Sequence, residues 1–294
     1  MNGLVLLDKP AGVSSQYAVT QIKRLFNVKK AGHTGTLDPF ATGLLPICLN
    51  EATKYADYFL QANKRYRAIA KLGVCSTTGD SEGTLIECLT MLPTLSQIQT
   101  KLLGLMGKQY QYPPRYSAIK YQGKKLYEYA RQGIQVPLQP RSIEILQLQL
   151  VRYEQGALEL DIACSKGTYI RSLISTIGEQ LECGAYTQAL RRLAVGTLEN
   201  FPIWNIAQLQ ILKNTEGEVG LRKAVVGIDA ALADFPKVIL DPPALLAIQQ
   251  GKVELITQPI TVGLVKIYDN LQQFRGLGEY DGQCLRAKRL LALN

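Results

Sequence analysis

The sequence predicts an α+β protein made of one large domain and one small β-rich domain. The chain has 294 residues, which exceeds the usual size of a single hydrophobic core. Helical and strand-like segments follow each other without a regular strand–helix alternation, and this argues against a parallel α/β sheet. Beyond a boundary near Ala233–Pro236, short strand-like segments separated by turn residues dominate. We therefore expect a first domain over residues 1–233 and a second domain over residues 237–294.

The large domain is expected to combine amphipathic helices with strands. Ser14 and Ser15 are suitable N-caps for a helix that runs to about Asn27 and carries apolar residues on one face. In Ala31–Asn50, glycines and prolines interrupt short apolar runs, so this segment is predicted to be a structured loop. The other predicted elements are strands at Gly3–Leu7 and Arg65–Leu72 and helices at Glu51–Leu60, Leu95–Met106 and Ile170–Cys183.

Two segments with strict alternation predict an antiparallel hairpin. In Arg141–Arg152, Leu146, Leu148 and Leu150 fall on one face, and Ile143 and Ile145 fall on the other. The next segment, Gly156–Cys164, alternates in the same way after a short turn. Near the C-terminus, strands that would form a partly open barrel are predicted at Val238–Leu240, Gly263–Asp269, Gln272–Tyr280 and Leu285–Leu293.

Charge and composition narrow the possible functions. The net charge of +9 and the pI near 9.2 suit an anionic partner such as nucleic acid, although a merely basic protein would show them too. The six cysteines form no CxxC pair and His33 is the one histidine, so we expect neither a metal site nor a disulfide framework. The apolar run Leu4–Leu7 is too short for a signal or membrane segment. We therefore expect a cytoplasmic protein that does not bind to membranes.

The most informative stretch is Ala31–Gly43, which displays one histidine and one carboxylate, His33 and Asp38, on a glycine-punctuated loop. Taken alone, Asp38 before Pro39 is more typical of a turn or a helix cap than of a catalytic group. The glycines could also cradle a phosphate, but the Gly-Lys-Ser/Thr ending of a P-loop is absent, and so is a dinucleotide-binding fingerprint.

Lys64-Arg-Tyr-Arg67 places basic residues around an aromatic ring. This pattern suits RNA, because the cations can meet phosphates while the ring stacks on a base. The alternative is a strand with a solvated basic face and Tyr66 in the core.

Cys164-Ser-Lys-Gly-Thr-Tyr-Ile-Arg-Ser172 lies where a strand meets a helix. If the backbone stays extended there, Tyr169 and Arg171 point the same way, and if the helix has begun they diverge. Arg171 is either an ordinary exposed arginine or the partner of a carboxylate, for which Asp38 is a candidate.

The segment Tyr112–Arg131 is rich in tyrosine and in basic residues, and Glu128 is its one acidic residue. Its prolines and glycines favour a flap that faces nucleic acid, and the alternative is a solvated helix face. The residues concerned are Tyr112, Tyr116, Tyr121, Tyr127, Tyr129, Arg115, Lys120, Lys124, Lys125 and Arg131.

Taken together, these blocks resemble the TruB family of tRNA pseudouridine synthases, bacterial type, from Leu6 to the end of the chain. The blocks that carry the resemblance are Leu6-Leu-Asp-Lys-Pro10, Gly32-His-Thr-Gly-Thr-Leu-Asp-Pro39, Leu44-Leu-Pro-Ile-Cys48, Lys64-Arg-Tyr-Arg67, Tyr116–Ala130, Cys164–Arg171 and Leu190-Arg-Arg-Leu193. Several blocks in one order and at family-like spacing are far more specific than any single block.

The resemblance implies a catalytic domain with a large mixed, mainly antiparallel sheet, an inserted thumb loop at about 114–142, and a C-terminal PUA-like barrel. It also implies that uridine 55 in the T loop of tRNA is flipped out and isomerised to pseudouridine, without a cofactor. Asp38 corresponds to the nucleophile, paired with Arg171, and Tyr66 to a residue that stacks on the uracil and could carry a proton. His33 would occupy the vacated space, and Tyr169 and Leu190 would line the pocket.

The predicted partner is the T stem-loop of tRNA, bound by a monomer. A non-catalytic tRNA-binding or tRNA-folding chaperone is the alternative, but pure binding has no need of a carboxylate that faces anionic RNA. The residues expected to contact RNA are Lys9, Lys64, Arg115, Lys120, Lys124, Lys125, Arg131 and Arg191.

Overall fold

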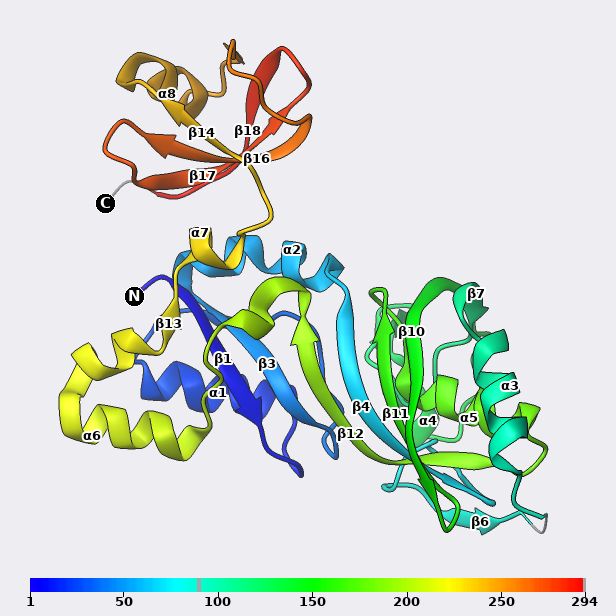
Figure 1. Cartoon of the computed structure of the whole chain (residues 1–294). Helices are drawn as coiled ribbons and strands as arrows, with labels where there is room; N and C mark the ends of the chain where they lie inside the picture. Colours follow the sequence, from blue (N-terminus) through cyan, green and yellow to red (C-terminus); the bar gives the residue numbers. More distant parts are fainter. Residues whose placement is uncertain (89–90, 293–294) are drawn as a thin grey trace.

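A computed structural model describes residues 1–88 and 91–292, and Leu293, the last residue of the predicted final strand, lies outside the described residues. Within those ranges, a nine-stranded sheet runs through the large domain in the order β13-β1-β3-β12-β4-β11-β10-β7, with β2 paired to β3 (Figure 1). Its strands are β1 (Gly3–Lys9), β2 (Ala31–His33), β3 (Thr42–Leu49), β4 (Lys64–Leu72), β7 (Gly107–Gln111), β10 (Arg141–Glu154), β11 (Ala157–Cys164), β12 (Ala185–Val195) and β13 (Val225–Val226).

The sheet is mixed because one neighbouring pair, β3 and β12, is parallel, whereas the other strand pairs of this sheet within the described residues are antiparallel. At this parallel contact Gly43 lies opposite Arg192, and its φ is +98°. A Cβ at Gly43 would lie 2.3 Å from the Arg192 carbonyl oxygen, so glycine is required for the two strands to approach. The α+β class with a mixed, mainly antiparallel sheet is confirmed.

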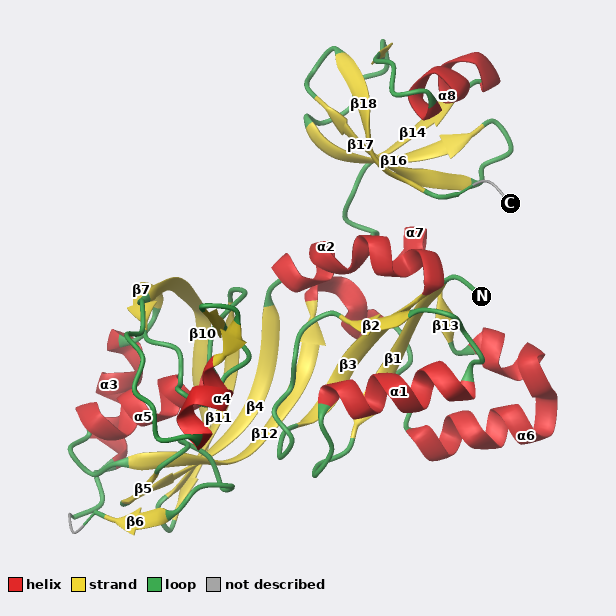
Figure 2. Ribbon diagram, turned by 180° about the vertical axis from the view of Figure 1, so that it is seen from behind, coloured by secondary structure: helices red, strands yellow, loops and turns green. Residues whose placement is uncertain are grey.

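Helices cover the sheet and the loops at its edges (Figure 2). The Ser14 hydroxyl accepts a hydrogen bond from the Tyr17 amide, which confirms the predicted N-cap of α1. That helix ends at Leu25, two residues before the expected Asn27, which has a φ of +49°. The α-helices are α1 (Ser15–Leu25), α2 (Ala56–Gln61), α3 (Leu95–Gly104), α4 (Leu126–Arg131), α5 (Ile170–Gln180), α6 (Ile206–Lys223), α7 (Ile228–Ala231) and α8 (Pro242–Gln249), and 3₁₀ turns occupy Asn50–Tyr55 and Gly196–Asn200.

The prediction of a loop over Ala31–Asn50 is wrong for most of that segment. Residues 31–33 form β2 and residues 42–49 form β3, and the loop proper is restricted to residues 34–41. Leu44, Leu45 and Leu49 in β3 are completely buried. Burial of this apolar run between β1 and β12 outweighs the local turn preference of glycine and proline.

The face assignment predicted for β10 is also wrong. Ile143 and Ile145 belong to the main core, and further along the strand Leu148 and Leu150 pack against the same core, whereas Leu146 is exposed. The register with β11 shifts between Ile145 and Gln147, so one extra residue reverses the inside–outside alternation. The predicted hairpin of β10 and β11 is confirmed.

Two insertions interrupt the large domain between strands of the main sheet. β5 (Val74–Ser76) and β6 (Leu85–Glu87) form a small hairpin. The segment 112–140 lies between β7 and β10, which pair with each other, and contains β8 (Lys120–Tyr121), β9 (Lys124–Lys125) and α4. We call this segment the thumb. It is an insertion, as expected, since the sheet continues across its base.

The C-terminal residues form a separate curled sheet in the order β14-β16-β17-β18-β15, partly covered by α8. This sheet lies next to α2 and α7 of the large domain (Figure 1). The Tyr55 hydroxyl donates a hydrogen bond to the Arg289 carbonyl (3.1 Å), and the ring of Phe274 packs against that of Tyr55. The strands are β14 (Lys237–Leu240), β15 (Glu254–Leu255), β16 (Gly263–Asp269), β17 (Phe274–Tyr280) and β18 (Cys284–Leu290).

Candidate active site

The loop at residues 34–41 is held rigidly beneath α1. The hydroxyl of Ser15 donates to the Leu37 carbonyl and accepts from the Leu37 amide, both at 2.8 Å. The ammonium of Lys9 donates to the carbonyls of Pro10, Val13 and Pro39 at 2.8, 2.8 and 3.1 Å. These bonds fix the backbone on both sides of Asp38, whose side chain remains about one-third exposed (32%).

Asp38 meets Arg171, as the sequence suggested. The Nε of Arg171 lies 2.9 Å from Oδ2 of Asp38, and one terminal nitrogen donates to Oδ1 at 3.2 Å. One of these contacts is a hydrogen bond and the other is an ion pair outside hydrogen-bond geometry, and together they restrain the position and orientation of the carboxylate. The helix α5 begins at Ile170, so Arg171 is already helical while Tyr169 is extended.

Arg171 is almost fully buried and holds more than Asp38. Its other terminal nitrogen lies 3.2 Å from a carboxylate oxygen of Asp80, itself buried, and donates to the Thr78 carbonyl at 2.9 Å. Asp80 was not among the predicted site residues, because nothing near it in the sequence indicates that it shares a guanidinium with Asp38. The guanidinium of Arg171 therefore connects the loop at residues 34–41 to the β5–β6 hairpin.

Burial raises the pKa of the Asp38 carboxyl, and the nearby charge of Asp80 raises it further. The Arg171 guanidinium acts in the opposite direction by charge and by hydrogen bonding, and the Lys9 ammonium adds to this effect. Asp38 therefore needs the charge of Arg171 to stay ionised, whereas a solvated carboxylate would be ionised without such a partner.

Asp38 and Arg171 lie between two cavities. The outer cavity, of about 590 Å³, is also lined by His33, Asp80 and thumb residues. The inner cavity, of about 290 Å³, is also lined by Tyr66, Tyr169 and Leu190. The structure thus brings all six predicted catalytic and substrate-binding residues to one place.

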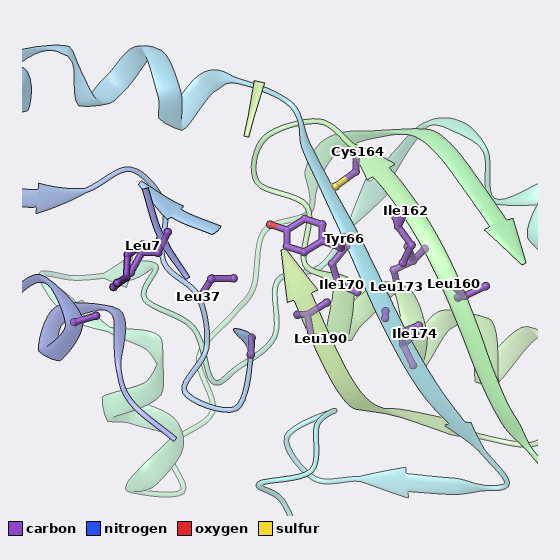
Figure 3. Packing of buried hydrophobic residues seen from close by; sticks show 14 of the residues in the cluster. Leu7, Leu37, Tyr66, Leu160, Ile162, Cys164, Ile170, Leu173, Ile174 and Leu190 are labelled. Atoms are coloured by element: carbon purple, nitrogen blue, oxygen red, sulfur yellow. The ribbon is translucent and has the colours of Figure 1, made fainter. Parts of the chain in front are cut away.

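Tyr66 comes from β4, where its ring is buried. In Figure 3 the ring lies near Leu190, and its hydroxyl points toward the side of the Leu37 loop. Tyr169 is held through its backbone, since its amide donates to the Gln111 side chain at 2.8 Å and its carbonyl accepts from it at 3.0 Å. Burial raises the pKa of both tyrosine hydroxyls. Burial, followed by the charge of Arg192, lowers the pKa of His33.

The thumb closes over this site. A terminal nitrogen of Arg171 donates to the Tyr116 carbonyl at 2.8 Å, and Ser117 lines both cavities. Lys125 and Arg131 lie on the ring of Tyr127, each 5.5 Å from its centre, and these three residues line the outer cavity. The other exposed basic residues of the predicted RNA-contacting set are Arg115, Lys120 and Lys124 on the thumb, and Arg191, which pairs with Asp8.

Two residues expected to contact RNA are turned inward, and this expectation is corrected. Lys9 is completely buried and bound to three carbonyls, as described above. The ammonium of Lys64 donates to the carbonyls of Phe59, Leu60 and Ala62, at 3.2, 2.6 and 2.5 Å, at the end of α2. Neither ammonium is free to meet a phosphate, because both satisfy buried backbone carbonyls.

The arginines on either side of Tyr66 also have structural partners. Arg65 binds both oxygens of Asp161 (2.7 and 3.1 Å), and Arg67 binds Asp161 and Glu159 (3.0 and 2.9 Å). Asp161 is buried on β11, and its local sequence gives no sign of this pairing. The basic face of β4 is therefore neutralised, while Tyr66 faces the cavity.

Within residues 1–88 and 91–292, no helix is long and apolar enough to cross a membrane. In the same part of the chain, no group of three or more His, Cys, Asp or Glu residues is arranged to hold a metal ion.

Three family models match successive parts of the chain. Residues 23–170 match the N-terminal domain model of TruB family pseudouridylate synthase. Residues 171–233 match the tRNA pseudouridylate synthase B C-terminal domain, and residues 236–291 match the C-terminal model of pseudouridine synthase II TruB.

Curated relatives are similar over nearly the full length. The chain is 42% identical over 301 residues to tRNA pseudouridine synthase B of Pectobacterium atrosepticum, covering 100% of this chain and 96% of the relative. It is 43% identical over 285 residues to tRNA pseudouridine synthase B of Yersinia pestis, covering 95% and 88%. A chain of the archaeal box H/ACA sRNP Nop10–Cbf5 complex has the same fold, with a TM-score of 0.73, 24% identity, and coverage of 98% of this chain and 85% of the other.

Proposed function

Since the chain belongs to the TruB family of pseudouridine synthases, we propose that it isomerises uridine 55 in the T loop of tRNA, with Asp38 as the nucleophile. Its activity is that of a tRNA pseudouridine synthase, and this catalytic function is favoured over a purely tRNA-folding role. The observation that supports the assignment of Asp38 is its pairing with Arg171, through one hydrogen bond and one ion-pair contact, between two cavities. We also expect it to act in the cytoplasm, where bacterial tRNA is found.

The reaction requires a carboxylate that approaches the sugar of an extruded nucleotide. Pseudouridine formation breaks the N1–C1′ bond, turns the base and joins C5 to C1′. Asp38 can attack C1′ and form a covalent intermediate, or it can take a proton from the sugar. Both routes need the carboxylate ionised and fixed in direction, which the contacts of Arg171 provide.

The inner cavity is the place proposed for the uracil ring. Base extrusion costs a few kcal/mol, which stacking inside the enzyme can offset. Tyr66 and Tyr169 offer aromatic rings there, and Leu190 an apolar wall. His33 lines the outer cavity, and we propose that it occupies the space that the base vacates in the RNA.

The thumb and the C-terminal sheet are proposed as RNA-contacting parts around this site. Residues 1–233 would form the catalytic domain, and residues 237–294 a PUA-like RNA-binding domain. The thumb carries exposed cations beside the outer cavity, Lys125 and Arg131 among them, which supports contact with the T stem-loop. Because thumb residues line both cavities, we propose that the thumb moves when RNA enters.

The test uses Asp38→Asn with a T stem-loop transcript. Pseudouridine is mapped by carbodiimide modification and primer extension, and RNA binding is measured separately by filter retention. We expect turnover to vanish while binding changes little, because the amide keeps the shape and loses the charge. Asp57→Asn, an exposed carboxylate on α2, serves as the control. Residual activity within tenfold of wild type would refute the role of Asp38.

A further inference from the structure

A buried arginine outside the predicted site residues faces the inner cavity. Arg192 is 2% exposed, yet among the described residues no carboxylate lies within ion-pairing distance of its guanidinium. Instead, its Nε donates to the Leu44 carbonyl at 2.7 Å, and a terminal nitrogen donates to the Gly35 carbonyl at 3.0 Å. A buried cation without a counter-ion is costly, so its position calls for a function.

The strand register aims Arg192 at Tyr66. In the antiparallel pair of β12 and β4, Arg192 lies directly opposite Tyr66, so their side chains leave the sheet on the same face. Both residues line the inner cavity. The neighbouring Arg191 points to the other face and pairs with Asp8. Arg192 is therefore the arginine of this pair that can act inside the cavity.

The two anchors leave one edge of the guanidinium for Tyr66. The Arg192 guanidinium is close enough to the Tyr66 hydroxyl to lower its pKa, while the Leu44 and Gly35 carbonyls hold two of its nitrogens. Gly35 itself belongs to the loop that carries Asp38. Arg192 thus connects the hydroxyl of Tyr66 to the backbone of the loop that carries the proposed nucleophile.

We propose that Arg192 is a positioning residue that fixes the Tyr66 hydroxyl oxygen to receive the C5 proton of the rotated base. This inference rests on the proposed function. In the step concerned, C1′ is already joined to C5, and the C5–H bond breaks. Its electron pair restores the ring double bond and its proton passes to the phenolate oxygen of Tyr66, which has given its own proton to solvent beforehand, while N1 takes up a proton from solvent. Over the whole reaction the base loses one proton at C5 and gains one at N1, so no oxidant or other reagent is needed.

The charges around Tyr66 agree with this role. Burial raises the pKa of its hydroxyl, and Arg192 counteracts this by its charge and its hydrogen bond. Cys164 on β11 and Asp38 on the loop both act to raise that pKa, so Arg192 is the cation that opposes them. A nearby cation stabilises the phenolate, which is the form of Tyr66 that can accept a proton.

The test measures single-turnover rates of Arg192→Gln and Arg192→Lys on T stem-loop RNA whose target uridine carries hydrogen or deuterium at C5. We expect Arg192→Gln to lower the rate by about tenfold to a hundredfold at unchanged RNA affinity. We also expect its deuterium isotope effect to exceed that of wild type, because C5 proton removal becomes more rate-limiting. Because the phenolate of Tyr66 is the base, the rate should rise with pH as Tyr66 ionises, and this rise should lie at higher pH in Arg192→Gln than in wild type. Arg192→Lys should recover part of the rate and shift the pH profile part of the way back.

A lower rate with an unchanged isotope effect and pH profile would mean that Arg192 is merely structural, and the inference would be overturned. A wild-type rate in Arg192→Gln would overturn it as well. If Arg192→Gln does not fold by circular dichroism, the same comparison is made with Arg192→Lys, which keeps the buried charge. Arg152→Gln, an exposed arginine paired with Glu154, is the control. Failure of the wild type to form pseudouridine would refute the proposed function instead.

Discussion

The contacts of Arg171 make Arg171→Lys a sharp test of the site. The guanidinium holds Asp38 by two nitrogens and also reaches Asp80, Thr78 and Tyr116. A lysine keeps the charge, but its single ammonium cannot serve all of these partners at once. The substitution therefore removes some of the directed contacts of the guanidinium but keeps most of the electrostatic attraction to Asp38.

The expected loss follows from the contacts. If lysine loses the hydrogen bond to Asp38, and such a charge-assisted bond contributes about 1.5–3 kcal/mol, the rate falls about 10- to 150-fold. Buried Asp80 loses a partner in the same variant, so the melting temperature should fall by several degrees, at about 2–4 °C for each kcal/mol.

The pH dependence provides a second measurement. Asp38 works as a carboxylate and its pKa is raised by burial, so the wild-type rate falls as the pH drops through that pKa. Arg171 opposes the rise, and weakening their pairing lifts the pKa further. The acid limb of the single-turnover rate should therefore move to higher pH in Arg171→Lys.

Arg65→Lys is the matched control, because Arg65 also binds a buried carboxylate, Asp161, through two nitrogens. It should lower stability and leave the rate and the acid limb as in wild type. A rate for Arg171→Lys within twofold of wild type, or an acid limb that does not move, would show that the pairing with Asp38 does not govern the reaction.

Three further changes test separate parts of the site. Tyr66→Phe should bind RNA normally and turn over slowly in the same assay, and normal turnover would exclude the hydroxyl from the mechanism but not the ring. Replacing Lys124 and Lys125 with alanine should flatten the salt dependence of RNA binding, by up to about one unit of slope for each lost phosphate contact, whereas an unchanged slope would show that they touch no phosphate. Asp161→Asn should cost about 1–3 kcal/mol in denaturant unfolding without slowing turnover. Burial raises the pKa of Asp161, but hydrogen bonds from its two arginines outweigh this and lower it, so the stability difference should disappear as the pH falls through that lowered pKa.

Local patterns predicted most elements of the large domain, and they failed where distant neighbours decide. The N-cap Ser14 and the hairpin of β10 and β11 depend on residues close in sequence, and both were predicted correctly. The strand β3 was mistaken for loop because its burial comes from β1 and β12. The bulge in β10 was invisible to an alternation count, since one extra residue is recognised only by its partner strand.

The sequence by itself determined the family, the α+β class and the pairing candidates Asp38 and Arg171, because these depend on residue types in a fixed order. Only the tertiary structure decided what each long basic side chain does. Lys9 and Lys64 turn to buried carbonyls, Arg171 acquires Asp80, and Arg192 meets Tyr66. A long cationic side chain can reach either solvent or a buried partner, and the choice is made by groups that folding brings within its reach.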